Sequence, residues 1–192
     1  YLAVSGVLVA VICIEDPLRA EAGEVIKGLR RLGLKHIVMM TGDNEKTACS
    51  VAKAIGIDEY YSEVLPEDKA NFIRSEHEKG RKVIMLGDGV NDSPALSQAD
   101  AGIAISDGAA IAREVADIMV GSDDLYSLLT LKKLSDLLMA RIHSNYRKII
   151  GFNFALIVLG VAGILPPATS ALLHNALTLE ISLRGMTNLL KE

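Results

Sequence analysis

The sequence predicts an α/β domain built on a parallel sheet, followed by an α-helical hairpin that crosses a membrane. The α/β domain is predicted because short segments rich in Val, Ile and Met alternate with amphipathic segments, and Gly, Asp or Pro stands at the changes between them. The hairpin is predicted from residues 149–173, which contain no ionisable side chain and exceed the about 20 apolar residues that a membrane helix requires.

Hydrophobic runs mark the expected strands, and amphipathic runs mark the expected helices. We expect strands at residues 3–14, 36–40, 82–86, 101–105 and 117–120, with a shorter one near Tyr60. Helices are expected at residues 17–32, 45–55, 66–79 and 109–116, with a short one after Asp92. Asp16 and Pro17 suit the start of the first helix, and Gly6 divides the first segment into one or two buried strands. This alternation implies a parallel sheet whose functional loops lie at the strand ends.

Composition allows one good-sized core and gives no sign of binding to nucleic acid. The chain has 192 residues, of which 50% are hydrophobic and 23% are charged, and its formal net charge is -4. An acidic chain lacks the excess of positive charge that binding to a phosphate backbone requires, so we expect no nucleic-acid partner. Neither Cys13 nor Cys49 has a second Cys or His at metal-ligand spacing, which favours buried free thiols.

The sequence changes character after residue 122. A helix of mixed polarity starts there and leads into the apolar stretch, which Pro166-Pro167 divides because proline cannot continue a helix. We therefore expect an α/β domain over residues 1–122, a connecting helix over residues 123–148 and two membrane helices over residues 149–192.

The basic residues Arg141, Arg147 and Lys148 precede the first crossing, which places its start on the cytoplasmic side. A pair of buried core helices is the alternative, because His174, Glu180 and Arg184 interrupt the second segment.

Three loops that follow predicted strands carry groups suited to phosphoryl transfer. Thr41, Gly42 and Asp43 lie where a strand ends and a helix begins, so their amides and the Thr41 hydroxyl could hold phosphate oxygens. Taken alone, such a tripeptide is more often a plain helix cap. Lys69 lies in the first turn of its helix, an electrostatically poor place for a cation unless it reaches an anion.

The loop that starts at Gly87 carries the most specific of these signals. Its residues Gly-Asp-Gly-Val-Asn-Asp-Ser-Pro follow a Val-Ile-Met-Leu strand and include two carboxylates, Asp88 and Asp92, spaced by four. Asp88 can bind Mg²⁺ through oxygen, Asn91 can donate to a phosphate, and the glycines let the backbone approach closely.

Together and in this order, Thr-Gly-Asp-Asn, Pro-Glu-Asp-Lys and Gly-Asp-Gly-Val-Asn-Asp resemble the motifs of the P-type ATPases, which are members of the haloacid-dehalogenase-like superfamily. Asp16-Pro17-Leu18-Arg19 also fits, so the resemblance covers nearly the whole chain. It implies a haloacid-dehalogenase-like Rossmannoid sheet, here an incomplete phosphorylation domain, and an enzyme that uses ATP and Mg²⁺.

The resemblance also implies roles for individual residues. Thr41 and Lys69 would contact an aspartyl phosphate, together with Gly42 of the same turn. Asn91 would hydrogen-bond to the phosphoryl group, and Asp92 would orient Lys69.

For the cofactors, the resemblance implies that Asp88 holds Mg²⁺, with Asp92 as the second carboxylate of the site. Asp43 would help to position the nucleotide and the metal.

One family motif is missing from these residues. The Asp-Lys-Thr-Gly signature that bears the phosphorylated aspartate occurs nowhere in the chain. In the family it lies upstream, so we expect a fragment whose missing part is N-terminal and which does not hydrolyse ATP by itself. The alternatives are a soluble phosphatase of the same superfamily, whose Asp-x-Asp nucleophile motif is also missing, and a non-catalytic module.

A single predicted hairpin after the phosphorylation domain resembles the heavy-metal branch of the family (type IB). This implies an integral protein of the cell membrane, with the lipid bilayer around the hairpin and the phosphorylation domain in the cytoplasm. The expected cargo is a divalent or soft cation of the Zn, Cd, Co and Cu class.

Polar groups inside a membrane helix are costly and are therefore candidates for function. Asn153 in the first crossing, and His174, Asn175 and Thr178 in the second, are the candidate ligands of the transported ion. His174 could instead form a hydrogen bond at the tip of the hairpin.

Glu180 and Arg184 are spaced for an i to i+4 pair. We expect this pair to be structural, with binding of the ion by Glu180 as the alternative.

Overall fold

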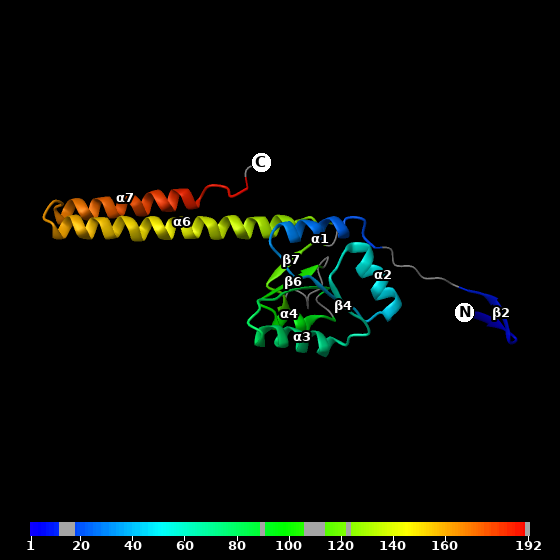
Figure 1. Ribbon diagram of the computed structural model, residues 1–192. Helices are drawn as coiled ribbons and strands as arrows, with labels where there is room; N and C mark the ends of the chain where they lie inside the picture. The colour runs from blue at the N-terminus through cyan, green and yellow to red at the C-terminus, as the bar shows by residue number, and fades with distance from the viewer. Residues whose placement is uncertain (12–17, 89–90, 106–113, 122–123, 191–192) are drawn as a thin grey trace. The chain divides into compact units, whose positions relative to one another are not determined.

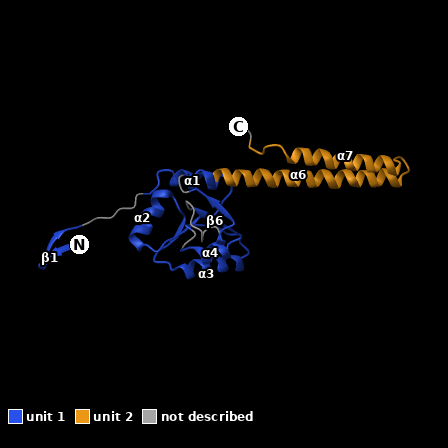
Figure 2. Ribbon diagram, turned by 180° about the vertical axis from the view of Figure 1, so that it is seen from behind, with its two compact units in different colours: residues 1–128 blue, residues 129–192 orange. Residues whose placement is uncertain are grey.

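The computed structural model describes residues 1–11, 18–88, 91–105, 114–121 and 124–190 (Figure 1). The chain separates into two compact units, Tyr1–Leu128 and Leu129–Glu192 (Figure 2). Asp16 and Pro17, Cys13, the centre of the Gly87 loop and most of the helix expected at residues 109–116 lie outside the described residues.

Unit 1 alternates strands and helices as predicted. Its strands are β1 (Leu2–Val4), β2 (Val7–Ala10), β3 (Val38–Met40), β4 (Glu59–Tyr61), β5 (Ile84–Gly87), β6 (Ala101–Ile105) and β7 (Ile118–Val120). Its helices are α1 (Ala22–Arg31), α2 (Glu45–Ile55), α3 (Pro66–Glu78) and α4 (Ser93–Gln98). β3 pairs with β4, β5 with β6 and β6 with β7, all in parallel, which confirms the predicted α/β class.

The strands do not form the single sheet that we expected. Among the described residues, β3 and β4 make one sheet, and β5, β6 and β7 make another in that order. In each sheet a strand takes as its partner the next strand along the chain, and β4 and β5 are not paired. The loops after β3 and β5 therefore belong to different sheets.

The first two strands also differ from the prediction, because they are not buried. β1 and β2 pair with each other in antiparallel fashion across a turn at Ser5 and Gly6, both of which have positive φ. All their residues are exposed, although most are apolar. Two strands that pair only with each other form no layer that could cover either face, which explains the error.

The core of the three-stranded sheet is built around Leu96 of α4 and Ala104 of β6, which are 1% and 0% exposed. α4 reaches this position because β6 carries a glycine beneath it. A Cβ atom placed on Gly102 would lie 2.6 Å from the carbonyl oxygen of Leu96. The helix that follows the Gly87 loop is therefore held close to the sheet.

Asp100 connects three elements at the end of the sheet that lies away from the Gly87 loop. Its carboxylate accepts hydrogen bonds from Lys82 Nζ at 2.6 Å and from the Val83 amide at 2.9 Å, and it lies 2.9 Å from His77 Nε2. The bonds from Lys82, Val83 and His77 lower the pKa of Asp100 to about 2. The end of α3 and the start of β5 are thus fixed to the turn before β6.

Unit 2 is a helical hairpin made of most of α6 (Ser127–Val161) and of α7 (Pro167–Gly185) (Figure 2). α7 begins after Pro166, whose extended backbone, with ψ at 146°, ends the preceding turn. The hairpin and its break at the two prolines agree with the prediction. Arg141 of α6 donates to the carbonyl oxygens of Arg184, Gly185, Thr187 and Asn188, and it thereby satisfies the end of α7.

No helix in the described part of the chain is both long enough and apolar enough to span a membrane. The stretch at residues 149–173 is divided between the end of α6 and the start of α7. Arg147 and Lys148 precede its first half, and His174 and Glu180 follow its second half, so neither helix has a long enough apolar window. The predicted membrane crossings are therefore not shown.

The expected pair of Glu180 with Arg184 is wrong. Glu180 Oε1 instead lies 3.0 Å from Lys148 Nζ of α6. Arg184 donates across the hairpin to Ser144 and Asn145, over 3.5 and 3.4 Å. Both side chains point towards α6, because the antiparallel hairpin offers them partners there.

We predict that Asp100 gives the protein a stability that depends on pH in the acid range. Because the folded pKa of about 2 lies below the ordinary value of 3.8, this stability is present above about pH 4 and is lost as the pH falls through about 2. In thermal unfolding followed by circular dichroism, Asp100→Asn should lower the midpoint most above pH 4. The difference from wild type should disappear towards pH 2, and an equal difference at every pH would contradict the prediction.

Candidate phosphoryl-transfer site

One pocket of about 300 Å³ brings together residues from three segments that are far apart in the sequence. It is lined by Gly42, Val64, Pro66, Lys69, Asp88, Asn91 and Asp92. Gly42 follows β3, the next three residues belong to the β4–α3 loop and the first turn of α3, and the last three follow β5. The pocket therefore contains residues from all three motifs, although β3 and β5 belong to different sheets.

Lys69 and Asp92 form a short ion pair in the pocket. Lys69 Nζ donates to Asp92 Oδ1 at 2.6 Å, and the two side chains are only 14% and 12% exposed. The start of a helix disfavours a cation, so a carboxylate at this distance offsets the unfavourable helix dipole around Lys69. Asp68 Oδ2 accepts from the Leu65 amide at 3.1 Å and satisfies one of the free donors at the start of α3. The ammonium group is thus directed into the pocket by its helix and held there by its partner.

Gly87 allows Asp92 to occupy this position. A Cβ atom at Gly87 would lie 2.5 Å from Asp92 Oδ2 and 2.7 Å from Asp92 Cβ, which is too close for any side chain. The backbone carbonyl of Asp92 also accepts from the Leu96 amide at 2.9 Å, as the first hydrogen bond of α4. Asp92 is therefore fixed both by the helix that it starts and by the strand end against which it lies.

Asp88 and Asn91 are joined within the Gly87 loop. The backbone amide nitrogen of Asn91 donates to Asp88 Oδ1 at 3.2 Å, and the side-chain nitrogen Nδ2 of Asn91 lies 3.4 Å from Asp88 Oδ2. Both side chains line the pocket together with the Asp92 carboxylate.

The oxygen donors of this pocket suit Mg²⁺. In the described part of the chain, no group of three or more His, Cys, Asp or Glu residues could hold a metal ion. Mg²⁺ is usually held by one or two carboxylates together with water and substrate phosphates, and the lining of this pocket includes two carboxylates, those of Asp88 and Asp92.

Thr41 and Asp43 do not line the pocket, although Gly42 between them does. The Thr41 hydroxyl donates to Asp43 Oδ2 at 2.9 Å and accepts from the Asp43 amide at 3.1 Å. The turn leads into α2, where Asn44 Oδ1 accepts from the Thr47 amide at 3.0 Å and caps the helix. The three pocket motifs thus meet, but the Thr41 hydroxyl is engaged within its own turn.

Sequence reasoning missed the segment between β4 and α3. The Glu63 amide donates to the Asp43 carbonyl at 2.9 Å, and the Val64 amide donates to the Thr41 carbonyl at 3.0 Å. Val64 lines the pocket, so this segment forms one of its walls. Glu63 has a φ of 54°, and no signal in the sequence predicts such a conformation for a residue other than glycine.

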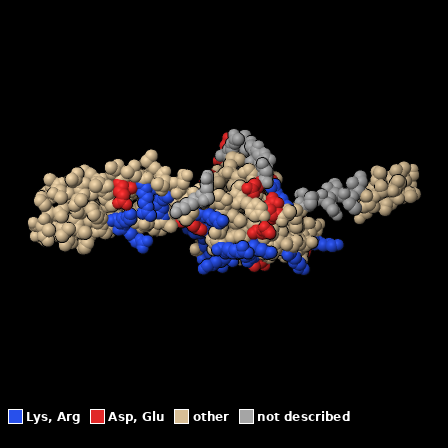
Figure 3. Space-filling view, turned by 90° about the horizontal axis from the view of Figure 1, so that it is seen from above, with Lys and Arg blue, Asp and Glu red and all other residues tan. Residues whose placement is uncertain are grey.

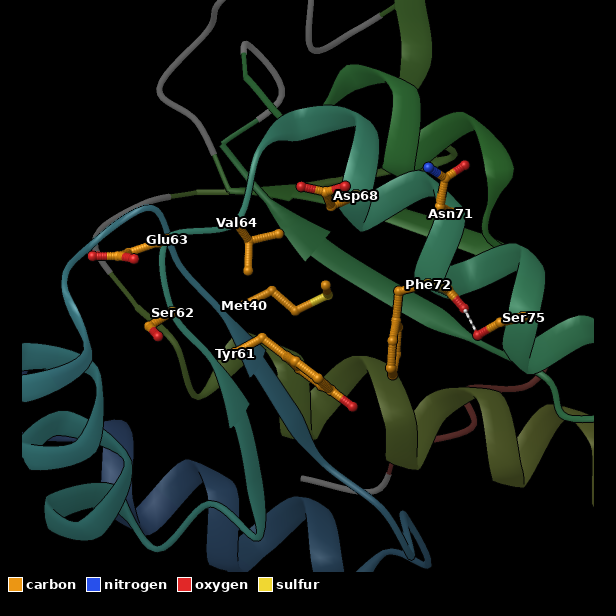
Figure 4. A pocket seen from close by; sticks show the side chains of 9 residues that line it. All are labelled: Met40, Tyr61, Ser62, Glu63, Val64, Asp68, Asn71, Phe72 and Ser75. Carbon is orange, nitrogen blue, oxygen red and sulfur yellow. Dashed lines mark hydrogen bonds between the residues drawn. The ribbon is translucent and has the colours of Figure 1, made fainter.

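A second pocket, of about 430 Å³, shares Val64 with the first in its lining (Figure 4). Met40 of β3, Tyr61 of β4 and Phe72 of α3 give it an apolar floor, and the two rings lie 5.4 Å apart at an angle of 58°. Glu63 and Asp68 add two carboxylates to its lining. The β4–α3 segment therefore contributes Val64 to both pockets.

In unit 2 the structure brings together two of the four candidate ligands of a transported ion. His174 Nδ1 lies 2.9 Å from Asn153 Oδ1 across the hairpin. The Thr178 hydroxyl donates to the backbone carbonyl of His174 at 3.0 Å, so its side chain is engaged with the backbone. Asn175, the fourth candidate, is exposed.

The chain is similar to known proteins in sequence and in fold. The model of one family, haloacid dehalogenase-like hydrolase, matches residues 2–100. The chain is 44% identical over 176 residues to a zinc-exporting P-type ATPase of Mycobacterium marinum. It is also 44% identical over 176 residues to a manganese-exporting P-type ATPase of Mycobacterium bovis. Both matches cover 91% of this chain and 24% of the relative, so the chain spans about a quarter of the length of these relatives.

The fold of the chain matches that of a solved transporter. The crystal structure of a zinc-transporting PIB-type ATPase in the E2.Pi state has a TM-score of 0.81 and 31% sequence identity to it. The match covers 90% of this chain and 28% of the transporter. The chain therefore belongs to the haloacid dehalogenase-like hydrolase family, and its homologues are heavy-metal P-type ATPases.

Proposed function

We propose that the chain is the C-terminal part of an ATP-driven heavy-metal transporter, which passes through an aspartyl-phosphate intermediate. The observation that carries the proposal is the meeting of Gly42, Lys69, Asp88, Asn91 and Asp92 in one pocket. A cation, amide donors and carboxylates for a metal are the groups that phosphoryl transfer requires, since its catalysis rests on positioning and on stabilising charge.

Each pocket residue has a role that follows from its chemistry. The Lys69 ammonium neutralises charge on the transferring phosphoryl group, and Asp92 keeps this ammonium in place. Asn91 Nδ2 and the amide of Gly42 are donors for phosphoryl oxygens. Thr41 can contribute its hydroxyl once it exchanges the Asp43 carboxylate for a phosphoryl oxygen.

Asp88 and Asp92 would hold Mg²⁺, and Asp43 would help to place the nucleotide. When bound, Mg²⁺ supplies positive charge next to the phosphoryl oxygens. Loss of either carboxylate would leave the metal with only one of these two carboxylate ligands, so Asp88 and Asp92 are expected to act as a pair.

The acceptor carboxylate belongs to polypeptide that precedes Tyr1 in the parent protein. No Asp-Lys-Thr-Gly signature occurs in the chain, which spans about a quarter of its relatives. The chain by itself is therefore expected to hydrolyse no ATP. In this assignment residues 1–122 form the C-terminal portion of a cytoplasmic phosphorylation domain, and residues 123–148 form a connecting helix.

Residues 149–192 would form a hairpin embedded in the bilayer of the cell membrane. Its surface supports this, because many large apolar side chains of the hairpin are more than half exposed to solvent. They are Phe154, Ile157, Val161, Ile164, Leu172, Leu179 and Leu183. On the face seen in Figure 3, the end of the hairpin at which α6 and α7 are joined carries no charged side chain. Such a surface suits lipid better than water.

The transported ion would bind near Asn153 and His174, which already lie in contact. The imidazole of His174 suits Zn²⁺, Co²⁺ and Cu ions, whereas an amide oxygen such as that of Asn153 shifts the preference towards harder metals. A zinc exporter and a manganese exporter are equally similar to this chain, so the likeness leaves the choice of metal open within the heavy-metal class.

We predict that Asp88→Asn in the parent-length protein weakens phosphoenzyme formation that depends on Mg²⁺. Loss of a direct ligand should raise the Mg²⁺ concentration for half-maximal phosphorylation at least about tenfold, since even indirect partners of a metal contribute this much. Asp136→Asn, which removes a carboxylate from the exposed pair with Lys132 on α6, is the control and should behave as wild type. An unchanged Mg²⁺ dependence in Asp88→Asn would refute the assignment.

We also predict that His174→Ala reduces turnover stimulated by metal, because it removes the imidazole from the site. Phosphorylation of the same variant by inorganic phosphate should remain, since the phosphate pocket is untouched. Ser182→Ala, whose hydroxyl donates only to the Thr178 carbonyl, is the matched control on α7. Wild-type stimulation in His174→Ala would exclude His174 as a ligand.

A further inference from the structure

We propose that Glu45 is a positioning residue for the phosphate pocket, because its carboxylate fixes the β4–α3 segment that forms one wall. The link between this anchor and phosphoryl transfer rests on the function proposed above. The anchor itself rests on contacts outside the three motifs.

Both oxygens of the Glu45 carboxylate are engaged by the end of β4. Tyr60 Oη donates to Oε1 at 2.7 Å, and Ser62 Oγ donates to Oε2 at 2.6 Å. Hydrogen bonds to an ionised acceptor are shorter and stronger than those between neutral groups. Glu45 lies in the first turn of α2, so these bonds join the start of this helix to the strand end.

This anchor requires an ionised Glu45 carboxylate and a protonated Tyr60 hydroxyl, and the contacts between the residues favour both. The hydroxyls of Ser62 and Tyr60 lower the pKa of Glu45 below its ordinary value, which keeps the carboxylate charged. Cys49 and Glu45 raise the pKa of Tyr60, which keeps its hydroxyl a donor.

The anchor acts on the pocket through the residues that follow Ser62. The Glu63 and Val64 amides donate to the carbonyls of Asp43 and Thr41, and Val64 lines the pocket. The segment is therefore held at Ser62 by Glu45 and at its next two residues by the turn that contains Gly42. A shift of Ser62 would move both the wall and this turn.

The backbone of Glu63 shows why such an anchor is needed. Its φ of 54° lies in the left-handed region, which is unfavourable for a residue with a Cβ atom. Strained conformations of this kind persist only where surrounding contacts fix them. The hydrogen bonds from Ser62 and Val64 fix the two sides of Glu63.

A simpler role for Glu45, as an acidic residue at the start of a helix, does not explain these contacts. The helix dipole favours any carboxylate in the first turn without a specific partner. Asn44 already caps α2. The two short bonds from Tyr60 and Ser62 are therefore additional to what the helix requires.

The test compares Glu45→Gln with Glu78→Gln in the parent-length protein. Glu45→Gln replaces the ionised acceptor of both hydroxyls by a neutral amide of nearly the same size, so the two charge-assisted bonds are lost. Glu78 is exposed at the end of α3, and the control removes the same charge there. Two quantities are measured: the inorganic phosphate concentration for half-maximal phosphoenzyme, and the hydrogen exchange of amides 62–65 by mass spectrometry.

Glu45→Gln should raise the half-maximal phosphate concentration roughly 3- to 10-fold, below the about 100-fold loss that a 1 Å misplacement can cause. It should also speed exchange at amides 62–65, and Glu78→Gln should change neither quantity. Ser62→Ala should raise the half-maximal phosphate concentration less in the Glu45→Gln background than in the wild-type background, because the two residues share one contact.

Unchanged phosphate dependence in Glu45→Gln would overturn the proposal, whether or not exchange becomes faster. A lower maximal level of phosphoenzyme at an unchanged half-maximal concentration would also overturn it, since that result indicates general loss of folded protein. If the wild type formed no phosphoenzyme, the proposed function would fail, and the exchange comparison would still decide whether Glu45 anchors the segment.

Discussion

The ion pair between Lys69 and Asp92 is the constraint on which the pocket depends. It joins the start of α3 to the loop after β5 over 2.6 Å, with both side chains largely shielded from solvent. A partly buried cation or carboxylate is costly without its partner, so each residue holds the other in place. The pair can form only because Gly87 has no side chain where Asp92 approaches the strand end.

The remaining wall of the pocket is supported in a different way. Backbone hydrogen bonds from Glu63 and Val64 hold the turn at Gly42, and Glu45 holds the residue before them. Charged groups therefore fix one side of the pocket, and a network of backbone and hydroxyl groups fixes the other side. This division explains how residues from two separate sheets can line one cavity.

The sequence predicted the features that depend on local chemistry. Hydrophobic runs and capping residues located most of the strands and helices, and the Gly87 loop with its two carboxylates identified the pocket. Features that depend on distant partners were missed. The separation into two parallel sheets depends on which strands pair with each other. The positive φ of Glu63 depends on hydrogen bonds made by its neighbours. The ion pair of Glu180 with Lys148 depends on the antiparallel packing of the hairpin. Spacing along one helix could not reveal a better partner on the facing helix.

In the proposed function, this pocket serves a phosphoryl group whose acceptor aspartate lies in polypeptide before Tyr1. The most direct measurement is to label the parent-length protein with radioactive ATP and Mg²⁺, quench it in acid, and map the labelled peptide. We expect an acid-stable label on an aspartate upstream of Tyr1 and none within residues 1–192. A label inside these residues, or no acid-stable label at all, would contradict it.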